Sequence, residues 1–199
     1  VFDCLRDDVL PALAEAAIAR CENQVRCWSI GCASGEEIYT VAILWNERLQ
    51  SRFPRVRLQA IGTDIDEQML QRARQAEYPA SSLNDLPLGW RETAFTQSGG
   101  LYILRPEFQN QVEFRPQDIR TGMPAEAFPL VLCRNLVLTY FAEELQRQVI
   151  QRIVKHIVPG GFLVVGKHET LPEGMGGLLP YRPDLGVYRS SEPAEQGRC

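Results

Sequence analysis

The chain has 199 residues, of which 45% are hydrophobic and 23% are charged, so it can bury one sizeable core and we expect a single domain. Its formal net charge of -4 supplies no basic field for nucleic acid or for an anionic membrane surface. No apolar run reaches the roughly 20 residues of a membrane span, and the acidic start is unlike a signal peptide, so we expect a soluble, cytoplasmic protein without membrane insertion.

Helical and strand-like segments alternate along the first third of the chain. Apolar side chains spaced three and four positions apart predict helices, and short apolar runs predict strands. In chain order the predicted elements are a helix over 2–19, a strand over 25–30, a helix from Glu36 onward, a strand over 58–62 and a helix over 67–76. Ser34 is the expected N-cap of the helix that begins at Glu36, and Asp64 or Asp66 caps the next one, with Asp66 favoured. These segments predict one βαβ unit.

The middle of the chain interrupts this alternation. Residues 78–114 are punctuated by prolines and glycines, and we interpret them as an insertion in which 101–104 and 111–114 are typical of hairpin arms or sheet edges. Alternation resumes with a strand over 130–133, a helix over 142–158 that Pro159-Gly160-Gly161 stops, a strand over 162–165 and a closing strand over 186–189. The whole pattern predicts an α/β protein with a doubly wound sheet.

The chain has six cysteines, which are Cys4, Cys21, Cys27, Cys32, Cys133 and Cys199. They form no Cys-x-x-Cys pair, and several lie in strand-like apolar runs. We therefore expect buried, reduced thiols, with neither disulfides nor a metal site.

The turn after the first predicted strand has the sequence Gly-Cys-Ala-Ser-Gly-Glu-Glu, and its glycines are Gly31 and Gly35. Ligands of doubly wound sheets bind where a strand turns into its helix. The glycines allow close backbone approach, and the helix N-terminus offers unpaired amides. The charges of Glu36 and Glu37 would repel a phosphate. We expect one carboxylate to favour the helix dipole and the other to bind a ligand with a positive charge or with hydroxyl and amino donors.

Polar side chains follow three further predicted strands. Asp64 ends the second strand, where a nucleotide-binding sheet places an acid that accepts hydrogen bonds from a ribose diol. Asp118 follows a strand-like run and can receive an adenine amino group, while Arg134, Asn135 and Tyr140 lie beyond the strand over 130–133. Taken singly, Asp64 and Asn135 could be helix caps and Tyr140 a core residue. Together, these strand ends favour one site for a nucleoside cofactor.

Five segments of the chain also carry a family resemblance. They are RCWSIGCASGEEIYTVAILWNE, IGTDIDEQMLQRARQAEY, LVLCRNLVLTYF, IVPGGFLVVGKHETL and GVYR. In order and spacing they resemble the CheR-type chemotaxis receptor methyltransferases. The resemblance implies a class I methyltransferase fold, which is a Rossmann-like, seven-stranded sheet, mostly parallel with an antiparallel last strand. It also implies S-adenosylmethionine (SAM) as cofactor, S-adenosylhomocysteine as product, and methylation of glutamate carboxylates on a chemoreceptor or other signalling protein.

The resemblance also implies roles for individual residues. Glu37 and Asp64 would contact the cofactor, Asp118-Ile119 and Asn135-Leu136 would line its adenine and methionine ends, and Tyr140 would lie beside the methyl group. The full predicted cofactor-binding set is Gly31, Cys32, Ala33, Glu37, Asp64, Ile65, Asp118, Ile119, Asn135 and Leu136, with Tyr140 as the catalytic residue. The insertion over 78–114 falls where the family carries a small antiparallel β subdomain that docks on the receptor or its tail.

The sequence departs from the family pattern in three places. The family's N-terminal helical domain and a Thr-x-Phe-Phe-Arg stretch would lie upstream of Phe2 and are absent from these residues. One extra residue separates Asn135 from Tyr140, and GKHETL replaces a Gly-His-Ser-Glu-Ser-Leu-like segment. The alternative function is a non-catalytic, SAM-sensing interaction module in a signalling pathway. A nicotinamide dehydrogenase is disfavoured by the glycine spacing and by the lack of a Tyr-x-x-x-Lys pair.

Overall fold

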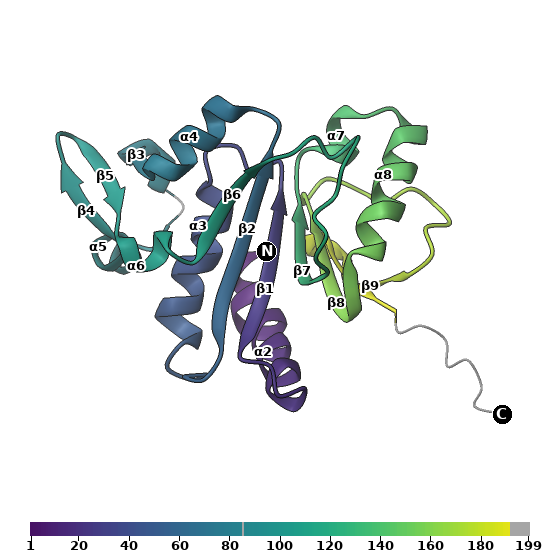
Figure 1. Ribbon diagram of the computed structural model, residues 1–199, viewed down its shortest axis with the longest axis horizontal. Coiled ribbons are helices and arrows are strands. Elements are labelled where there is room, and N and C mark those ends of the chain that lie inside the picture. Colours follow the sequence, from purple (N-terminus) through teal and green to yellow (C-terminus); the bar gives the residue numbers. More distant parts are fainter. Residues whose placement is uncertain (85, 192–199) are drawn as a thin grey trace.

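The computed structural model describes residues 1–84 and 86–191, and across them it forms a seven-stranded sheet with the order β6-β2-β1-β7-β8-β10-β9 (Figure 1). Its strands are β1 (Gln24–Ile30), β2 (Arg57–Asp64), β6 (Val112–Pro116), β7 (Phe128–Cys133), β8 (Ile157–Val165), β9 (Leu178–Arg182) and β10 (Val187–Ser190). Pairing is parallel from β6 through β8, whereas β10 is antiparallel to both of its neighbours. The predicted doubly wound sheet with an antiparallel last strand is confirmed.

Helices connect these strands and cover the sheet. In chain order the helical elements are α1 (Phe2–Cys4), η1 (Leu5–Val9), α2 (Leu10–Ala19), α3 (Glu36–Leu44), η2 (Trp45–Leu49), α4 (Glu67–Gln75), η3 (Ala80–Leu83), α5 (Leu88–Ala94), α6 (Pro106–Gln109), α7 (Val137–Tyr140), α8 (Glu143–Lys155) and η4 (Pro183–Leu185). The helix predicted over 2–19 is confirmed as the run α1-η1-α2. Pro11 lies in the first turn of α2, just after a π-helical turn, where its missing N–H is tolerated.

Alternate side chains of the buried strands pack on opposite faces of the large sheet, as the period of a strand requires. In β7, Leu130 and Leu132 join a core cluster that includes residues of α2, α3 and α4, whereas Val131 and Cys133 join a second cluster with residues of α8. Every residue of β7 is buried. Both faces are therefore covered, and binding groups are left to the loops at the strand ends.

A second, three-stranded antiparallel sheet occupies the segment that we interpreted as an insertion. Its strands are β3 (Glu77–Pro79), β4 (Phe95–Ser98) and β5 (Leu101–Leu104), in the order β3-β5-β4 (Figure 1). The hairpin expected between 101–104 and 111–114 is wrong, because β5 pairs with β3 and β4. Val112–Pro116 instead pairs with β2 at the edge of the large sheet, which agrees with the other interpretation of that segment as a sheet edge.

Two predicted helix ends also differ from the structure. The N-cap of α3 is Gly35, at φ +88°, and not Ser34, whose hydroxyl donates to the Glu36 carboxylate at 2.8 Å. The helix predicted over 142–158 ends at Lys155, and Pro159-Gly160-Gly161 lies inside β8 instead of stopping the helix. The β7-β8 ladder shifts register between Phe128 and Leu130, which accommodates this irregular start of β8. Within the described ranges, no helix is long and apolar enough to cross a membrane.

Most of the cysteines behave as buried thiols, as predicted. Cys4, Cys27, Cys32 and Cys133 are buried and unbridged, whereas Cys21 is exposed; Cys199 lies outside the described residues. Burial raises the pKa of Cys32 and the pKa of Cys133 to about 12. These two thiols therefore stay protonated, and weakly nucleophilic, at neutral pH.

Candidate functional site

A cavity of about 250 Å³ lies at the carboxyl ends of the central strands. It is bounded by the segments that follow β1, β2, β6 and β7. Its lining consists of Ile30, Gly31, Thr63, Asp64, Ile65, Gln117, Asp118, Ile119, Arg120, Leu136 and Phe141. Six residues of the predicted cofactor-binding set are therefore brought together, namely Gly31, Asp64, Ile65, Asp118, Ile119 and Leu136. We name this space the strand-end cavity.

The loop after β1 is folded tightly against β2. The backbone N–H groups of Gly31 and Cys32 both donate to the Thr63 carbonyl, at 2.8 and 3.0 Å. Gly31 has φ +67°, and a Cβ on it would lie 2.6 Å from the Cδ2 atom of Leu136. Only glycine meets both requirements. Cys32 is buried, whereas Ala33 is exposed, so of the two only Ala33 lies at the surface of the loop.

Asp64 holds this loop as well as lining the cavity. One carboxylate oxygen accepts the backbone N–H of Ala33 at 2.9 Å, and the other accepts the backbone N–H of Asp66 at 2.9 Å. Asp66 itself caps α4 by accepting from the N–H groups of Gln68 and Met69, as predicted. Each oxygen of Asp64 keeps lone-pair capacity for a second donor. The acid can thus bind a hydroxyl without giving up its structural bonds.

Another part of the lining of the strand-end cavity combines a carboxylate with apolar surface. Asp118 accepts from the Arg120 guanidinium, through Nε at 2.9 Å and Nη2 at 2.8 Å, and from its backbone N–H. These hydrogen bonds lower the pKa of Asp118, so it stays ionised. Ile65 is 62% exposed at the cavity rim. Arg120 was not predicted, because a lone arginine two residues after an acid gives no clear signal in the sequence.

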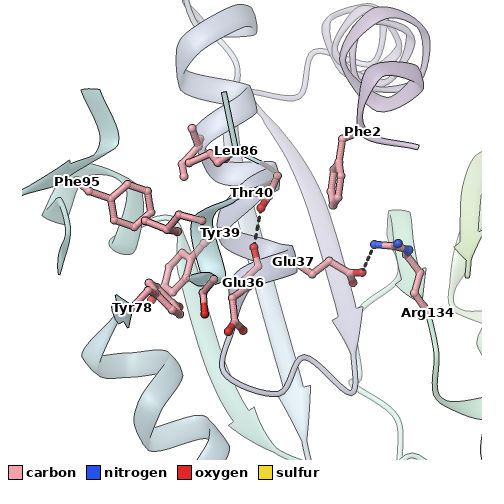
Figure 2. Close-up of a pocket in the computed structure, with 12 residues that line it drawn as sticks. Phe2, Glu36, Glu37, Tyr39, Thr40, Tyr78, Leu86, Phe95 and Arg134 are labelled. Atoms are coloured by element: carbon pink, nitrogen blue, oxygen red, sulfur yellow. Dashed lines mark hydrogen bonds and ion pairs between the residues drawn. The ribbon is translucent and has the colours of Figure 1, made fainter. Parts of the chain in front are cut away.

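Glu37 forms the most enclosed charged pair of the site. Its carboxylate accepts from the Ser29 hydroxyl at 2.9 Å. It also accepts from Nη1 of Arg134 at 2.8 Å, the contact drawn as a dashed line in Figure 2. The side chains of Glu37 and Arg134 are only 20% and 22% exposed. Burial raises the pKa of Glu37, and the positive charge of Arg134 and the hydrogen bond from Ser29 oppose this rise. The neighbouring Glu36 instead accepts the Ser34 hydroxyl, so the two adjacent carboxylates have different surroundings.

A second cavity, of about 320 Å³, begins at this pair. It is lined by Phe2, Glu36, Glu37, Tyr39, Thr40, Ile43, Tyr78, Ser82, Leu83, Leu86, Phe95 and Arg134. Figure 2 shows Glu37 and Arg134 pointing toward each other at one side, with the rings of Tyr39, Tyr78 and Phe95 at the other. The Tyr78 hydroxyl donates to the Ser34 carbonyl at 2.7 Å, which links the small sheet to the loop after β1. We name this space the aromatic cavity.

Arg134 was expected among the polar groups that follow the strand over 130–133, but no role in binding was predicted for it. Its guanidinium lies 5.5 Å from the ring centroid of Phe2, and its Nε is buried without a hydrogen-bond partner in the described part of the chain. The arginine thus has unused donor capacity beside the aromatic cavity.

The loop after β7 places the remaining predicted residues. Asn135 has φ +54°, and its backbone N–H donates to the Glu169 carboxylate at 2.9 Å. Leu136 turns toward Gly31 and lines the strand-end cavity. Tyr140, at the end of α7, is 75% exposed and lines neither cavity. The core packing considered for Tyr140 in the sequence analysis is therefore not found. No group of three or more metal-ligating side chains occurs among the described residues.

Comparison with known proteins identifies the family of the chain. Residues 1–179 match the family model described as "CheR methyltransferase, SAM binding domain". The chain is 32% identical over 170 residues to the chemotaxis protein methyltransferase of Listeria monocytogenes, a match that covers 85% of this chain and 62% of that protein. It is 30% identical over 175 residues to chemotaxis protein methyltransferase 1 of Pseudomonas aeruginosa, again covering 85% of this chain and 62% of the relative.

Among solved structures, the chain is similar to SAM-bound CalS10, an amino pentose methyltransferase from Micromonospora echinaspora. The TM-score is 0.45 and the identity 20%, over 95% of this chain and 64% of that one. The chain spans about 62% of the length of the two bacterial relatives described above. The family description names SAM, so the cofactor predicted from the sequence is confirmed. Because the family model covers 179 of the 199 residues, the chain belongs to the CheR methyltransferase family and contains its SAM-binding domain.

Proposed function

We propose that the protein transfers a methyl group from SAM to carboxylates of a chemotaxis signalling protein, in the cytoplasm, and that the acceptors are glutamate side chains of a chemoreceptor. The product would be a methyl ester. The observation that carries this proposal is the Glu37–Arg134 pair, whose side chains meet at 2.8 Å beside the aromatic cavity. In the sequence, both residues lie within a few positions of residues that line the strand-end cavity. A charged, largely enclosed pair in that place suits a boundary between cofactor and acceptor.

The strand-end cavity has the donor and acceptor groups that an adenosine needs. Asp64 supplies acceptor oxygens for a ribose diol. Asp118 can accept a hydrogen bond from an adenine amino group in addition to those it accepts from Arg120. Ile65, Ile119 and Leu136 supply apolar surface for the base. The absence of a Cβ at Gly31 lets the Leu136 side chain pack against the loop backbone, and both residues line the cavity.

Glu37 is assigned to the methionine end of the cofactor. A largely buried carboxylate matches the positive charge of an amino group, and Ser29 and Arg134 hold it in place. SAM, when bound, supplies a methyl group on a positively charged sulfur. The residues around it have to orient that group and keep water away from it.

The chemistry asks for alignment more than for acid or base catalysis. A glutamate carboxylate has a reference pKa of about 4.3 and is already ionised at neutral pH, so no general base is needed. Holding the reacting groups in position can supply roughly 7 to 11 kcal/mol of the barrier reduction in favourable cases. We assign to Arg134 the task of attracting the acceptor carboxylate, because its positively charged side chain lines the aromatic cavity. The small sheet, which borders the aromatic cavity through Tyr78 and Phe95, is assigned to acceptor docking.

The test is transfer of a radiolabelled methyl group by the full-length protein to chemoreceptor cytoplasmic fragments. We expect protein-bound label that base releases as methanol, the behaviour of a carboxyl ester. Label that resists base would indicate methylation of another atom. Absence of transfer together with tight S-adenosylhomocysteine binding would favour the non-catalytic sensing module. One observation favours that alternative, namely that Tyr140 lies outside both cavities.

A further inference from the structure

One carboxylate joins three segments on the far side of the strand-end cavity. The Oε2 atom of Glu169 accepts the backbone N–H groups of Gly166 at 2.6 Å and of Asn135 at 2.9 Å. Its Oε1 atom accepts the hydroxyl of Thr139 at 2.6 Å. Glu169 follows β8, Asn135 follows β7, and Thr139 lies in α7. Glu169 itself lines neither cavity.

The loop that Glu169 holds contains one residue in an unfavourable backbone conformation. Asn135 lies in the left-handed region at φ +54°, which asparagine tolerates, whereas Leu136 has φ -133° and ψ -82°. The conformation of Leu136 persists only where surrounding contacts fix it. The hydrogen bond from the Asn135 N–H to Glu169 is one such contact, and the Thr139 hydroxyl adds a second one four residues further on.

Gly166, Asn135 and Glu169 are closely packed against one another. A Cβ atom on Gly166 would lie 2.6 Å from Oδ1 of Asn135 and 2.7 Å from Oε2 of Glu169. The end of β8 therefore has no side chain at the point where the loop and the carboxylate meet it. The spacing Gly166-Lys-His-Glu169 lets the acid turn back onto its own strand end while it reaches across to the loop.

The position of this loop decides two features of the proposed site. Leu136 lines the strand-end cavity, and it packs so closely on Gly31 that a Cβ there would lie 2.6 Å from its Cδ2 atom. Tyr140 ends the short helix α7, whose Thr139 is held by Glu169. A shift of the loop would change the cavity wall and the direction of Tyr140 together.

We infer that Glu169 is a positioning residue for methyl transfer, which sets the Asn135–Tyr140 segment against the cofactor cavity without touching the reacting groups. The inference rests on the proposed function. A carboxylate suits this task because hydrogen bonds to a charged acceptor are stronger than those between neutral groups. It also gives the segment GKHETL a role that the family resemblance did not supply.

The test compares Glu169→Ala and Glu169→Gln with Glu173→Ala in the full-length protein. Glu173 is an exposed carboxylate of the same segment, and no hydrogen bond or ion pair of its side chain is found in the described part of the chain. Three quantities are measured: amide hydrogen exchange over residues 134–141, S-adenosylhomocysteine affinity, and turnover at saturating SAM and acceptor.

We expect Glu169→Ala to speed exchange in this segment and to lower turnover by about 10- to 100-fold, the range that a displaced site produces, with a much smaller loss of affinity. Glu169→Gln should recover most of the turnover, because its amide oxygen can accept both backbone N–H groups while its amide nitrogen donates to Thr139. Glu173→Ala should match the unaltered protein in all three quantities.

Unchanged turnover and exchange in Glu169→Ala would overturn the inference. It would also be overturned if Glu169→Gln kept the slow exchange of the unaltered protein but had the low turnover of Glu169→Ala, because the charge would then act without the loop moving. If Glu169→Ala does not fold, Glu169→Asp decides by the same measurements, since the shorter acid cannot reach all three donors. If the unaltered protein transfers no methyl group, the proposed function fails. Exchange over residues 134–141 then decides by itself whether Glu169 holds the loop.

Discussion

The carboxylate of Asp64 accepts a hydrogen bond of 2.9 Å from the backbone N–H of Ala33, 31 residues earlier in the chain. This bond ties the end of β2 to the loop after β1, and the same side chain lines the strand-end cavity. One acid therefore shapes the loop and offers oxygens to a ligand. Its neighbour Asp66 caps α4 and does not line the cavity, which makes the two acids a matched pair for experiment.

Asp64→Ala should weaken S-adenosylhomocysteine binding by about 1 to 3 kcal/mol, because ribose hydroxyls and the Ala33 N–H both lose a charged acceptor. Asp66→Ala should leave affinity nearly unchanged and lower the free energy of unfolding by about 1 kcal/mol, the usual cost of a lost N-cap. Calorimetric titration and urea unfolding of both variants check this. Equal, small losses of affinity would reduce Asp64 to a structural residue.

Gly31→Ala should impair binding more than folding. Both Gly31 and Gly99 have positive φ, at +67° and +58°, so alanine at either position carries a backbone strain of about 1 to 2 kcal/mol. A Cβ at 31 would also push Leu136 into the strand-end cavity, whereas a Cβ at 99 has open space around it. We expect S-adenosylhomocysteine affinity to fall by about tenfold or more, or about 1.4 kcal/mol, in Gly31→Ala alone. Similar affinities in the two variants would contradict this.

Glu37 should make both binding and stability depend on pH. Burial raises its pKa in the folded state, so between the unfolded and folded pKa values the folded protein binds more protons. The stability that this group contributes is present at low pH and is lost as pH rises through the folded pKa. As the pH falls through the raised pKa of Glu37, the unaltered protein should gain stability relative to Glu37→Gln, measured by urea unfolding at a series of pH values.

Cofactor affinity should change in the opposite direction over the same range. As Glu37 takes up a proton, it loses the charge that we assign to the amino group of the ligand, so S-adenosylhomocysteine should bind more weakly at lower pH. Glu37→Gln should bind weakly throughout and lack this pH dependence. The same pH dependence in both proteins would assign the titration to another group.

Tyr140→Phe tests whether the exposed phenol acts in transfer. Tyr140 is 75% exposed, and its side chain makes no hydrogen bond within the described residues, so the free energy of unfolding and the cofactor affinity should stay unchanged. Turnover at saturating cofactor and acceptor should fall if acceptor binding brings the hydroxyl to the reacting carboxylate, the pattern of an interaction made mainly in the transition state. Turnover within error of the unaltered protein would remove Tyr140 from the mechanism.

The cysteines should separate by reactivity toward iodoacetamide at neutral pH. Cys32 and Cys133 are buried, and burial raises their pKa to about 12, so both should label slowly in the native state. Cys21 is exposed and should label quickly. Peptide mass spectrometry at timed intervals measures each position, with urea-unfolded protein as the reference in which all label. Fast native labelling of Cys133 would indicate that the β7 region opens readily.

Local sequence patterns were enough to predict the strand ends that carry Asp64 and Asp118, and to predict Asp66 as a helix cap. Each of these depends on an apolar run next to a polar residue, which is a pattern within a few positions. The edge strand β6 was harder to assign, because 112–116 looks the same whether it pairs with 101–104 or with β2. Strand pairing partners are set by the whole fold and not by the strand's own residues.

Contacts between residues far apart in the chain could not be predicted from the sequence. The pairing of Glu37 with Arg134 spans 97 positions, and that of Asn135 with Glu169 spans 34. The family resemblance placed Glu37 at the cofactor but gave no role to Arg134 or Glu169. Tyr140 was expected beside the methyl group on motif similarity, yet side-chain direction at the end of a four-residue helix depends on the loop before it, and the phenol lies in solvent.

The order β8-β10-β9 puts the last strand of the described residues between two strands that precede it in the chain. On the ribosome, β6, β2, β1, β7 and β8 can pair as they emerge, but β9 has no partner until Val187–Ser190 has left the exit tunnel. A premature stop codon just before Val187 would therefore not yield a slightly shortened domain. It would leave the edge of β8 open and β9 without its partner, a form prone to aggregation and suited to recognition by chaperones.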